Sequence, residues 1–205
     1  SILWAGRQRR WENRMEMRRV NRELTGMTAG LIGFGGTGTA IARRAGAFGM
    51  KCVAVDPVVT EADGLADWLG KPERLREMAR HSEVLFVCCP LTPETRNRVD
   101  SEIIHAMPAG GYVINVTRGG IVNEDALYDA LHSGHLAGAG LDVTSQEPLP
   151  DDSPLWELDN VIITPHTAGA SQHRIPRIQD RVIKNIENLA NGKPLEGVID
   201  KRKGY

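Results

Sequence analysis

The stretch LIGFGGTG, residues 31–38, decides the fold of this chain. Its three glycines, Gly33, Gly35 and Gly38, follow a short apolar run, and a second apolar run, VAVD, ends at Asp56. The first glycine permits a tight turn from strand to helix, the second lets backbone amides approach a pyrophosphate, and the third lets the helix pack closely on the strand. The spacing predicts a dinucleotide cradle, with the diphosphate at a helix N-terminus.

The acid that ends the second run indicates which dinucleotide is bound. Asp56 lies 18 residues after Gly38, where a carboxylate can accept both ribose hydroxyls of an adenosine. The same carboxylate would repel a 2′-phosphate, and the residues that follow it, Pro57, Val58 and Val59, supply no cation to offset the repulsion. We therefore expect NAD rather than NADP.

Length and composition are those of an ordinary globular protein. The residues are 41% hydrophobic and 25% charged, as in ordinary soluble proteins. A length of 205 residues is enough for one domain or one domain with extensions. The net charge of -1 argues against a general nucleic-acid binder. The sequence has no apolar run of membrane-spanning length, no secretory signal at its start and no Cys/His spacing typical of a zinc site.

Three cysteines, an odd number, include the adjacent pair Cys88 and Cys89 inside the apolar run VLFVCCP. Adjacent cysteines rarely pair with each other, so we expect reduced core thiols in a cytoplasmic protein.

The first 24 residues form a basic linker helix or arm in our interpretation. Residues 1–23 carry seven arginines against three glutamates. Such a stretch is usually a solvated or interface face, and nucleic-acid binding is the alternative, which would require strongly salt-dependent association.

Beyond the arm, short apolar runs alternate with helical stretches. The runs are LIGF, CVAV, VLFVC, YVINV, AGAGLDV and NVIITP. Alternation of this kind predicts an α/β Rossmann-type fold, a doubly wound parallel sheet with helices on both faces, over residues 25–192. The last helix should run from about Ser171 to Asn191 and end at Gly192, and residues 193–205 then leave the domain.

Ionisable side chains follow three of the predicted strands, at the edge where such sheets bind ligands. They are Arg118, Asp142, Glu147 and His166. Each alone is commonly structural: a surface ion pair, a turn acid or a helix cap. Placed together, they suit reduction of a 2-oxo acid, with Arg118 holding a carboxylate, His166 donating a proton and Glu147 orienting the imidazole.

Five linked motifs resemble the D-isomer-specific 2-hydroxyacid dehydrogenases over roughly residues 25–200. They are LIGFGGTG with Asp56, CCPLTPETRNRVD, VINVTRGGIVNEDAL, GLDVTSQEPLP and NVIITPHTAGAS. The resemblance implies that Arg118 binds substrate, that His166 is the proton donor paired with Glu147, and that Asp142 contacts the nicotinamide carboxamide. The same resemblance implies further cofactor contacts at Gly36, Thr37, Cys89, Pro90, Val116 and Thr117.

The chain also departs from the family pattern. Gly36 and Thr37 stand where the family usually has a larger side chain followed by isoleucine or valine, but backbone amides do most of the binding there, so we expect NAD binding to survive. Family members normally carry about a hundred residues before this region, as a second domain that closes over the substrate. We therefore expect a cofactor domain whose segment 193–205 returns toward a missing substrate domain.

The expected activity is hydride transfer between NAD(H) and a small 2-hydroxy or 2-oxo acid, by a homodimer paired through Trp4 and Trp11 of the arm. Glyoxylate, hydroxypyruvate, lactate and phosphoglycerate remain open as substrates. The alternative is a non-catalytic NAD(H) sensor or corepressor-like scaffold, because fold does not fix function.

Overall fold

A computed structural model describes residues 21–201. The predicted arm at residues 1–24, with Trp4 and Trp11, lies outside the described residues up to residue 20, as do residues 202–205 of the predicted return segment. The strands are β1 (Thr28–Ile32), β2 (Lys51–Val55), β3 (Trp68–Gly70), β4 (Val84–Val87), β5 (Gly111–Asn115), β6 (Leu136–Leu141) and β7 (Val161–Ile163). The helices are α3 (Gly36–Ala47), α4 (Leu75–His81), α5 (Ser101–Ala106), α6 (Glu124–His132) and α7 (Arg174–Ala190), with 3₁₀ turns η1 (Pro72–Arg74) and η2 (Pro154–Glu157).

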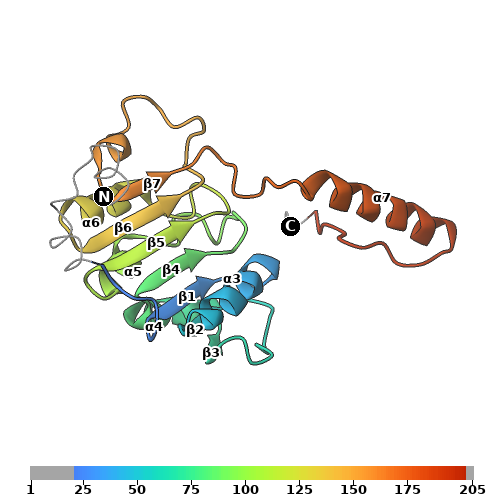
Figure 1. Cartoon of the computed structure of the whole chain (residues 1–205), viewed down its shortest axis with the longest axis horizontal. Coiled ribbons are helices and arrows are strands. Elements are labelled where there is room, and N and C mark those ends of the chain that lie inside the picture. Colours follow the sequence, from blue (N-terminus) through green and yellow to red (C-terminus); the bar gives the residue numbers. More distant parts are fainter. Residues whose placement is uncertain (1–20, 202–205) are drawn as a thin grey trace.

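All seven strands lie in one parallel sheet, in the order β3-β2-β1-β4-β5-β6-β7 (Figure 1). The chain winds outward from β1 through β2 to β3, then returns to β4 beside β1 and winds outward the other way. The order therefore reverses between β1 and β4, which is where a doubly wound sheet opens a crevice for a ligand. The predicted fold class is confirmed.

Two hydrophobic clusters hold the helices against the sheet. The larger cluster joins the sheet to α4, α5 and α6 through buried side chains such as Met78, Ile104 and Leu127. The smaller cluster joins α3 to the other face through Ala42 and Ala45. The sheet thus has helices on both faces, and its strand ends are held at fixed positions.

Helix starts differ in how they are capped. The Asp100 side chain accepts a hydrogen bond from the backbone N–H of Ile103 at the start of α5, and Asn123 does the same for Ala126 in α6. The N-cap of α3 is Gly35, and no described side chain caps that helix. The first N–H groups of α3 are therefore left for an outside acceptor.

The end of β1 and the presence of β3 differ from the sequence expectation. The strand predicted at LIGF ends at Ile32, because Gly33 has a φ of 96° and turns the chain, with its N–H bonded to the Val55 carbonyl at 2.8 Å. Strand β3 was not predicted, since three residues are too few to show an alternating pattern.

Helix α7 stands apart from the sheet, with the chain returning alongside it toward the C-terminus (Figure 1). It begins at Arg174 rather than near Ser171, because residues 171–174 form a turn, and Gly192 ends it with a φ of 63° as expected. Its apolar side chains are between 48% and 72% exposed: Ile175, Ile178, Val182, Ile183, Ile186 and Leu189. Within residues 21–201, then, the apolar stripe of α7 is not covered.

No helix within the described range is long and apolar enough to cross a membrane.

Candidate active site

The glycine turn connects β1 to α3 at the point where the strand order reverses. A Cβ atom on Gly33 would lie 2.9 Å from the backbone nitrogen of Cys89, and one on Gly38 would lie 2.2 Å from the carbonyl oxygen of Gly33. Neither position has room for a side chain. Gly35 and Gly36 are exposed, and a Cβ on either would meet nothing within 4 Å.

This geometry fits a diphosphate. Open space lies in front of the N-terminus of α3, which no described side chain caps. The first turn of this helix, which includes Thr37, carries no acidic side chain. Backbone N–H groups and the positive end of the helix dipole favour an anion at such a position. The residues present can therefore hold the dinucleotide that the glycine spacing predicts.

Asp56 ties the glycine turn to the end of β2. Its carboxylate is 8% exposed, with Oδ2 accepting from the Phe34 N–H at 2.7 Å and Oδ1 accepting from the Val58 and Val59 N–H groups, each at 2.8 Å. A carboxylate has about four acceptor positions, so three backbone donors leave capacity for a ribose hydroxyl.

Cys89 and Pro90 follow β4 on the other side of the crevice. The Cys88 N–H bonds to the Ile32 carbonyl at 2.8 Å, which places this segment against the glycine turn. Burial raises the pKa of the Cys88 thiol to about 12 and that of the Cys89 thiol to about 11. Both cysteines are free and protonated at neutral pH, so Cys89 presents a small apolar wall rather than a nucleophile.

The loop after β5, Val116 to Gly119, carries Arg118 and is held by the buried side chain of Asn115. Asn115 accepts from the Thr117 N–H at 3.2 Å and donates to the Arg118 carbonyl at 2.9 Å. The Arg118 guanidinium is exposed and donates to the Thr117 carbonyl at 2.7 Å. Its position is therefore set by backbone contacts, and most of its five donors remain available.

Glu147 and His166 form a close pair across two loops. Glu147 Oε2 and His166 Nδ1 are 2.7 Å apart, with the side chains 38% and 48% exposed. The hydrogen bond to His166 lowers the pKa of the Glu147 carboxyl; partial burial opposes it, while the Thr144 N–H and the charge of Arg118 reinforce it. An ionised Glu147 in this position fixes the imidazole ring through Nδ1, and Nε2 takes no part in the pair.

The backbone at His166 is in the left-handed region, with a φ of 53°. Its N–H bonds to the carbonyl oxygens of Asp142 and Thr164, at 2.8 and 3.0 Å. A non-glycine residue adopts this conformation rarely and at some cost, which the surrounding bonds offset. The side chain is thus held toward Glu147 by the backbone as well as by the hydrogen bond.

Asp142 is buried behind that pair at the end of β6. Burial raises the pKa of its carboxyl, but hydrogen bonds from the Thr164 hydroxyl and the Ala168 and Thr167 N–H groups outweigh burial and hold the pKa below its ordinary value. Asp142 therefore stays ionised and anchors the loop that carries His166.

The fold thus brings Arg118, Glu147 and His166 to one rim, at the ends of β5, β6 and β7, on the same edge of the sheet as the glycine turn and Asp56. Two further residues that shape this rim were not singled out in the sequence: Asn115 and Thr164. The hydrogen bond from Thr164 to Asp142 joins segments that are distant in sequence, whereas the Asn115 bonds lie within the loop after β5 and depend on its conformation.

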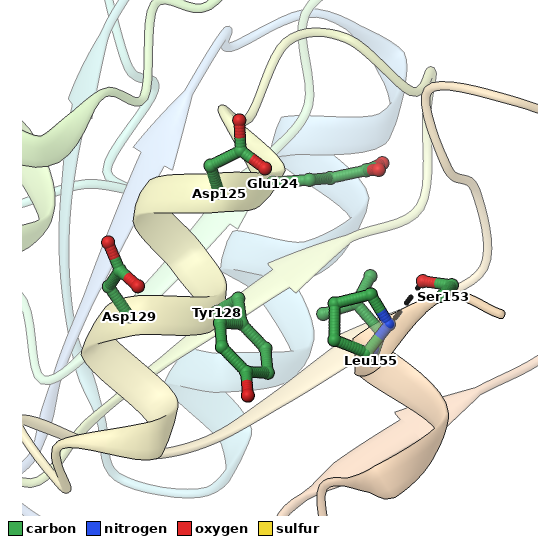
Figure 2. A pocket seen from close by; sticks show the side chains of 7 residues that line it. Glu124, Asp125, Tyr128, Asp129, Ser153 and Leu155 are labelled. Carbon is green, nitrogen blue, oxygen red and sulfur yellow. Dashed lines mark hydrogen bonds between the residues drawn. The ribbon is translucent and has the colours of Figure 1, made fainter.

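A pocket lies between α6 and η2 (Figure 2). It is lined by Glu124, Asp125, Tyr128, Asp129, Ser153, Pro154 and Leu155. None of the predicted site residues contributes to it, and no three His, Cys, Asp or Glu side chains within residues 21–201 are arranged to hold a metal ion.

Comparisons with known proteins indicate one family. The sequence model of the family "D-isomer specific 2-hydroxyacid dehydrogenase, NAD binding domain" matches residues 4–168. Glycerate dehydrogenase of Methylorubrum extorquens is 40% identical over 174 residues, which cover 84% of this chain and 52% of that protein. Hydroxypyruvate reductase of Blautia hydrogenotrophica is 39% identical over 176 residues, covering 86% and 54%.

Among solved structures, a D-isomer specific 2-hydroxyacid dehydrogenase from Xanthobacter autotrophicus Py2, in complex with NADPH and MES, matches with a TM-score of 0.85. It is 34% identical, and the match covers all of this chain and 81% of that one. The chain spans about half the length of the two curated relatives. Through this NAD-binding domain, the chain belongs to the D-isomer specific 2-hydroxyacid dehydrogenases.

Proposed function

We propose that this chain is the cofactor domain of an enzyme that transfers a hydride between NAD(H) and a small 2-hydroxy or 2-oxo acid. The observation that carries the proposal is the 2.7 Å pair of Glu147 and His166 within the electrostatic reach of Arg118. Reduction of a 2-oxo acid requires a proton donor with an acid that orients it, and an arginine that can bind the substrate carboxylate through two hydrogen bonds.

The cofactor supplies or accepts the hydride when it is bound. Gly35, Gly36 and Thr37 would hold its diphosphate with backbone N–H groups, and Asp56 would accept from the adenosine ribose. Asp142 has an Oδ2 that accepts only the Ala168 N–H among the described residues, which leaves it free to accept from a carboxamide as well. Cys89, Pro90, Val116 and Thr117 would form the walls between these two ends.

Each group on the rim has a separate task. Arg118 would bind the substrate carboxylate and polarise the neighbouring carbonyl through paired N–H donors. His166 would give its proton from Nε2 to the carbonyl oxygen during reduction and take it back during oxidation. Glu147, already ionised, would favour the charged ring and fix its orientation at Nδ1.

Exposure of the rim to water should limit catalysis by the described residues alone. His166 and Glu147 keep 48% and 38% of their side-chain surface exposed, and hydride transfer proceeds best where water is excluded. We propose that residues 25–192 form the NAD-binding domain, and that residues 1–24 and 193–205 link it to a domain that closes over this rim. The uncovered stripe of α7 is consistent with a further packing partner.

The relatives named above support the choice of a first substrate to test. Glycerate and hydroxypyruvate are the reduced and oxidised forms of one three-carbon acid, so hydroxypyruvate is the first 2-oxo acid to test, with glyoxylate as its shorter analogue. We also propose a cytoplasmic location, because Cys52, Cys88 and Cys89 are all free thiols. Separately, we propose that the protein is a homodimer.

The test separates binding from chemistry. NADH is titrated by fluorescence into the chain, an Asp56→Ala variant and a His166→Ala variant, and NADH oxidation is followed with hydroxypyruvate and glyoxylate. We expect binding by the chain, binding by His166→Ala and a large loss in Asp56→Ala. We also expect little turnover by the 205 residues alone. When the chain is fused to the part of a relative that it does not match, we expect turnover that depends on His166.

Absence of NADH binding would overturn the proposal. Binding with no His166-dependent turnover in the joined protein would favour the NAD(H)-sensing scaffold instead.

A further inference from the structure

The strand β3 brings a lysine to the adenosine end of the cradle. The N–H of Asp56 bonds to the carbonyl of Gly70, the last residue of β3, at 3.0 Å. Lys71 follows directly, and its Nζ donates to the carbonyl of Pro57 at 3.0 Å. The ammonium group therefore sits beside the turn that follows Asp56, although it is 15 residues away in sequence.

Neither Lys71 nor its basic neighbour Arg98 is neutralised by a carboxylate. Among residues 21–201, neither forms an ion pair within 4.0 Å, whereas Arg74 nearby pairs with Glu77 at 2.6 Å. Arg98 donates to the carbonyl of Pro72 at 2.8 Å. Two cations thus border this corner, each held only by a main-chain oxygen.

Asp56, in contrast, is already surrounded by donors. Its two oxygens accept three backbone N–H groups, which stabilise its charge and fix its place. The repulsion that this carboxylate exerts on a second anion is reduced by those dipoles and by the Lys71 ammonium at the next turn.

We propose that Lys71 is a specificity-determining residue that receives the 2′-phosphate of NADP(H), so that the cradle accepts NADP(H) as well as NAD(H). This rests on the proposed nucleotide site. A lysine is a compact charge on a flexible stem, and it can exchange one neutral carbonyl for a phosphate oxygen, which gives a stronger, charge-assisted bond. Residues 57–59 carry no cation, as the sequence shows, but the fold supplies one from another strand.

The structural neighbour from Xanthobacter autotrophicus Py2, 34% identical to this chain, was solved in complex with NADPH, which supports the proposal. Lys71 would act on one end of the cofactor only. Its removal should therefore change the affinity for NADPH and leave that for NADH unchanged.

The experiment compares two dinucleotides and their two adenosine fragments. Kd values for NADH and NADPH are measured by fluorescence, and those for ADP and 2′,5′-ADP by calorimetry, with the chain and with Lys71→Ala, Lys71→Arg and Lys51→Ala. Lys51 is the matched control: it is an exposed lysine at the opposite, amino end of β2, and its loss changes the net charge equally.

We expect Lys71→Ala to weaken NADPH and 2′,5′-ADP about tenfold, with NADH and ADP unchanged within about twofold. Lys71→Arg should retain NADPH, and Lys51→Ala should change neither. Raising the salt concentration should weaken NADPH binding more in the unaltered chain than in Lys71→Ala.

Equal effects of Lys71→Ala on both dinucleotides, or no effect on either, would overturn the inference. NADH binding without NADPH binding would overturn it and leave the proposed function intact. Failure of both dinucleotides to bind would overturn the two together.

Discussion

A methyl group on Gly119 would lie 1.8 Å from the carbonyl oxygen of Thr144, so the loop that carries Arg118 touches the loop that carries Glu147. No side chain fits between them. This contact, rather than a left-handed turn, is what requires glycine at position 119, and it sets how closely Arg118 approaches Glu147.

Substitution Gly119→Ala should therefore force the two loops apart. We expect the free energy of unfolding to fall by about 1–3 kcal/mol. Gly169→Ala is the control, since a Cβ at position 169 meets nothing within 4 Å, and its effect should stay within about 0.5 kcal/mol. Chemical denaturation measures both, and equal stability of the two variants would contradict the contact.

Asp142 should make stability depend on pH. Its folded pKa is held below the ordinary value because three hydrogen bonds outweigh burial. The folded state therefore binds its proton less readily than the unfolded state, and the stability gained is complete above the ordinary carboxyl range and lost as pH falls through the folded pKa.

Accordingly, Asp142→Asn should destabilise the chain at pH 7 by about 1–3 kcal/mol, because buried donors lose their acceptor. The difference from the unaltered chain should shrink below about pH 4. Thermal unfolding between pH 3 and 7 tests this, with the exposed Asp151→Asn as control. A gap that is constant with pH would argue against an ionised Asp142.

Removal of the His166 imidazole should raise the pKa of Glu147 toward its ordinary value, because the bond to His166 is the main cause of its lowering. The measurement is a pH titration of the Glu147 side-chain carboxyl carbon by NMR in His166→Ala. His173→Ala removes an exposed histidine that lies outside this pair and should leave the titration unchanged.

Substitutions on the α7 stripe should leave the sheet domain intact. Ile178→Glu with Val182→Glu changes two exposed side chains on a helix with no buried residue, so we expect a change within about 0.5 kcal/mol in unfolding. Leu127→Ala in α6, fully buried, should cost about 2–5 kcal/mol. A comparable loss from the α7 variant would mean that this helix packs on the domain.

The thiols of the folded chain should resist alkylation. Burial raises the pKa of all three cysteines, to about 12 for Cys88 and about 11 for Cys89, which leaves almost no thiolate at pH 8. We expect iodoacetamide to modify the unfolded chain at three positions, and mass spectrometry to find the native chain unmodified over the same time. Rapid labelling of native Cys89 would indicate an open, ionised thiol.

What the sequence predicts and what it misses have different physical origins. The Gly33 turn and Asp56 follow from local spacing, and the convergence of Arg118, Glu147 and His166 follows from the rule that parallel strands end at one edge. The close approach of Gly119 to Thr144 and that of Lys71 to Pro57 arise between separate segments, whereas the Asn115 bridge is local but exists only in the loop conformation that follows β5. Such contacts depend on loop conformations that no periodicity encodes.

The reversal of strand order between β1 and β4 divides the labour of the domain. Asp56 and Lys71 belong to the β1-β2-β3 half, while Arg118, Glu147 and His166 belong to the β5-β6-β7 half. A substitution that abolishes the function of one half need not impair the function of the other half. A protein with a single substitution at His166 would lose its proton donor and still bind the nucleotide, so it could respond to the redox state of the cell without catalysis.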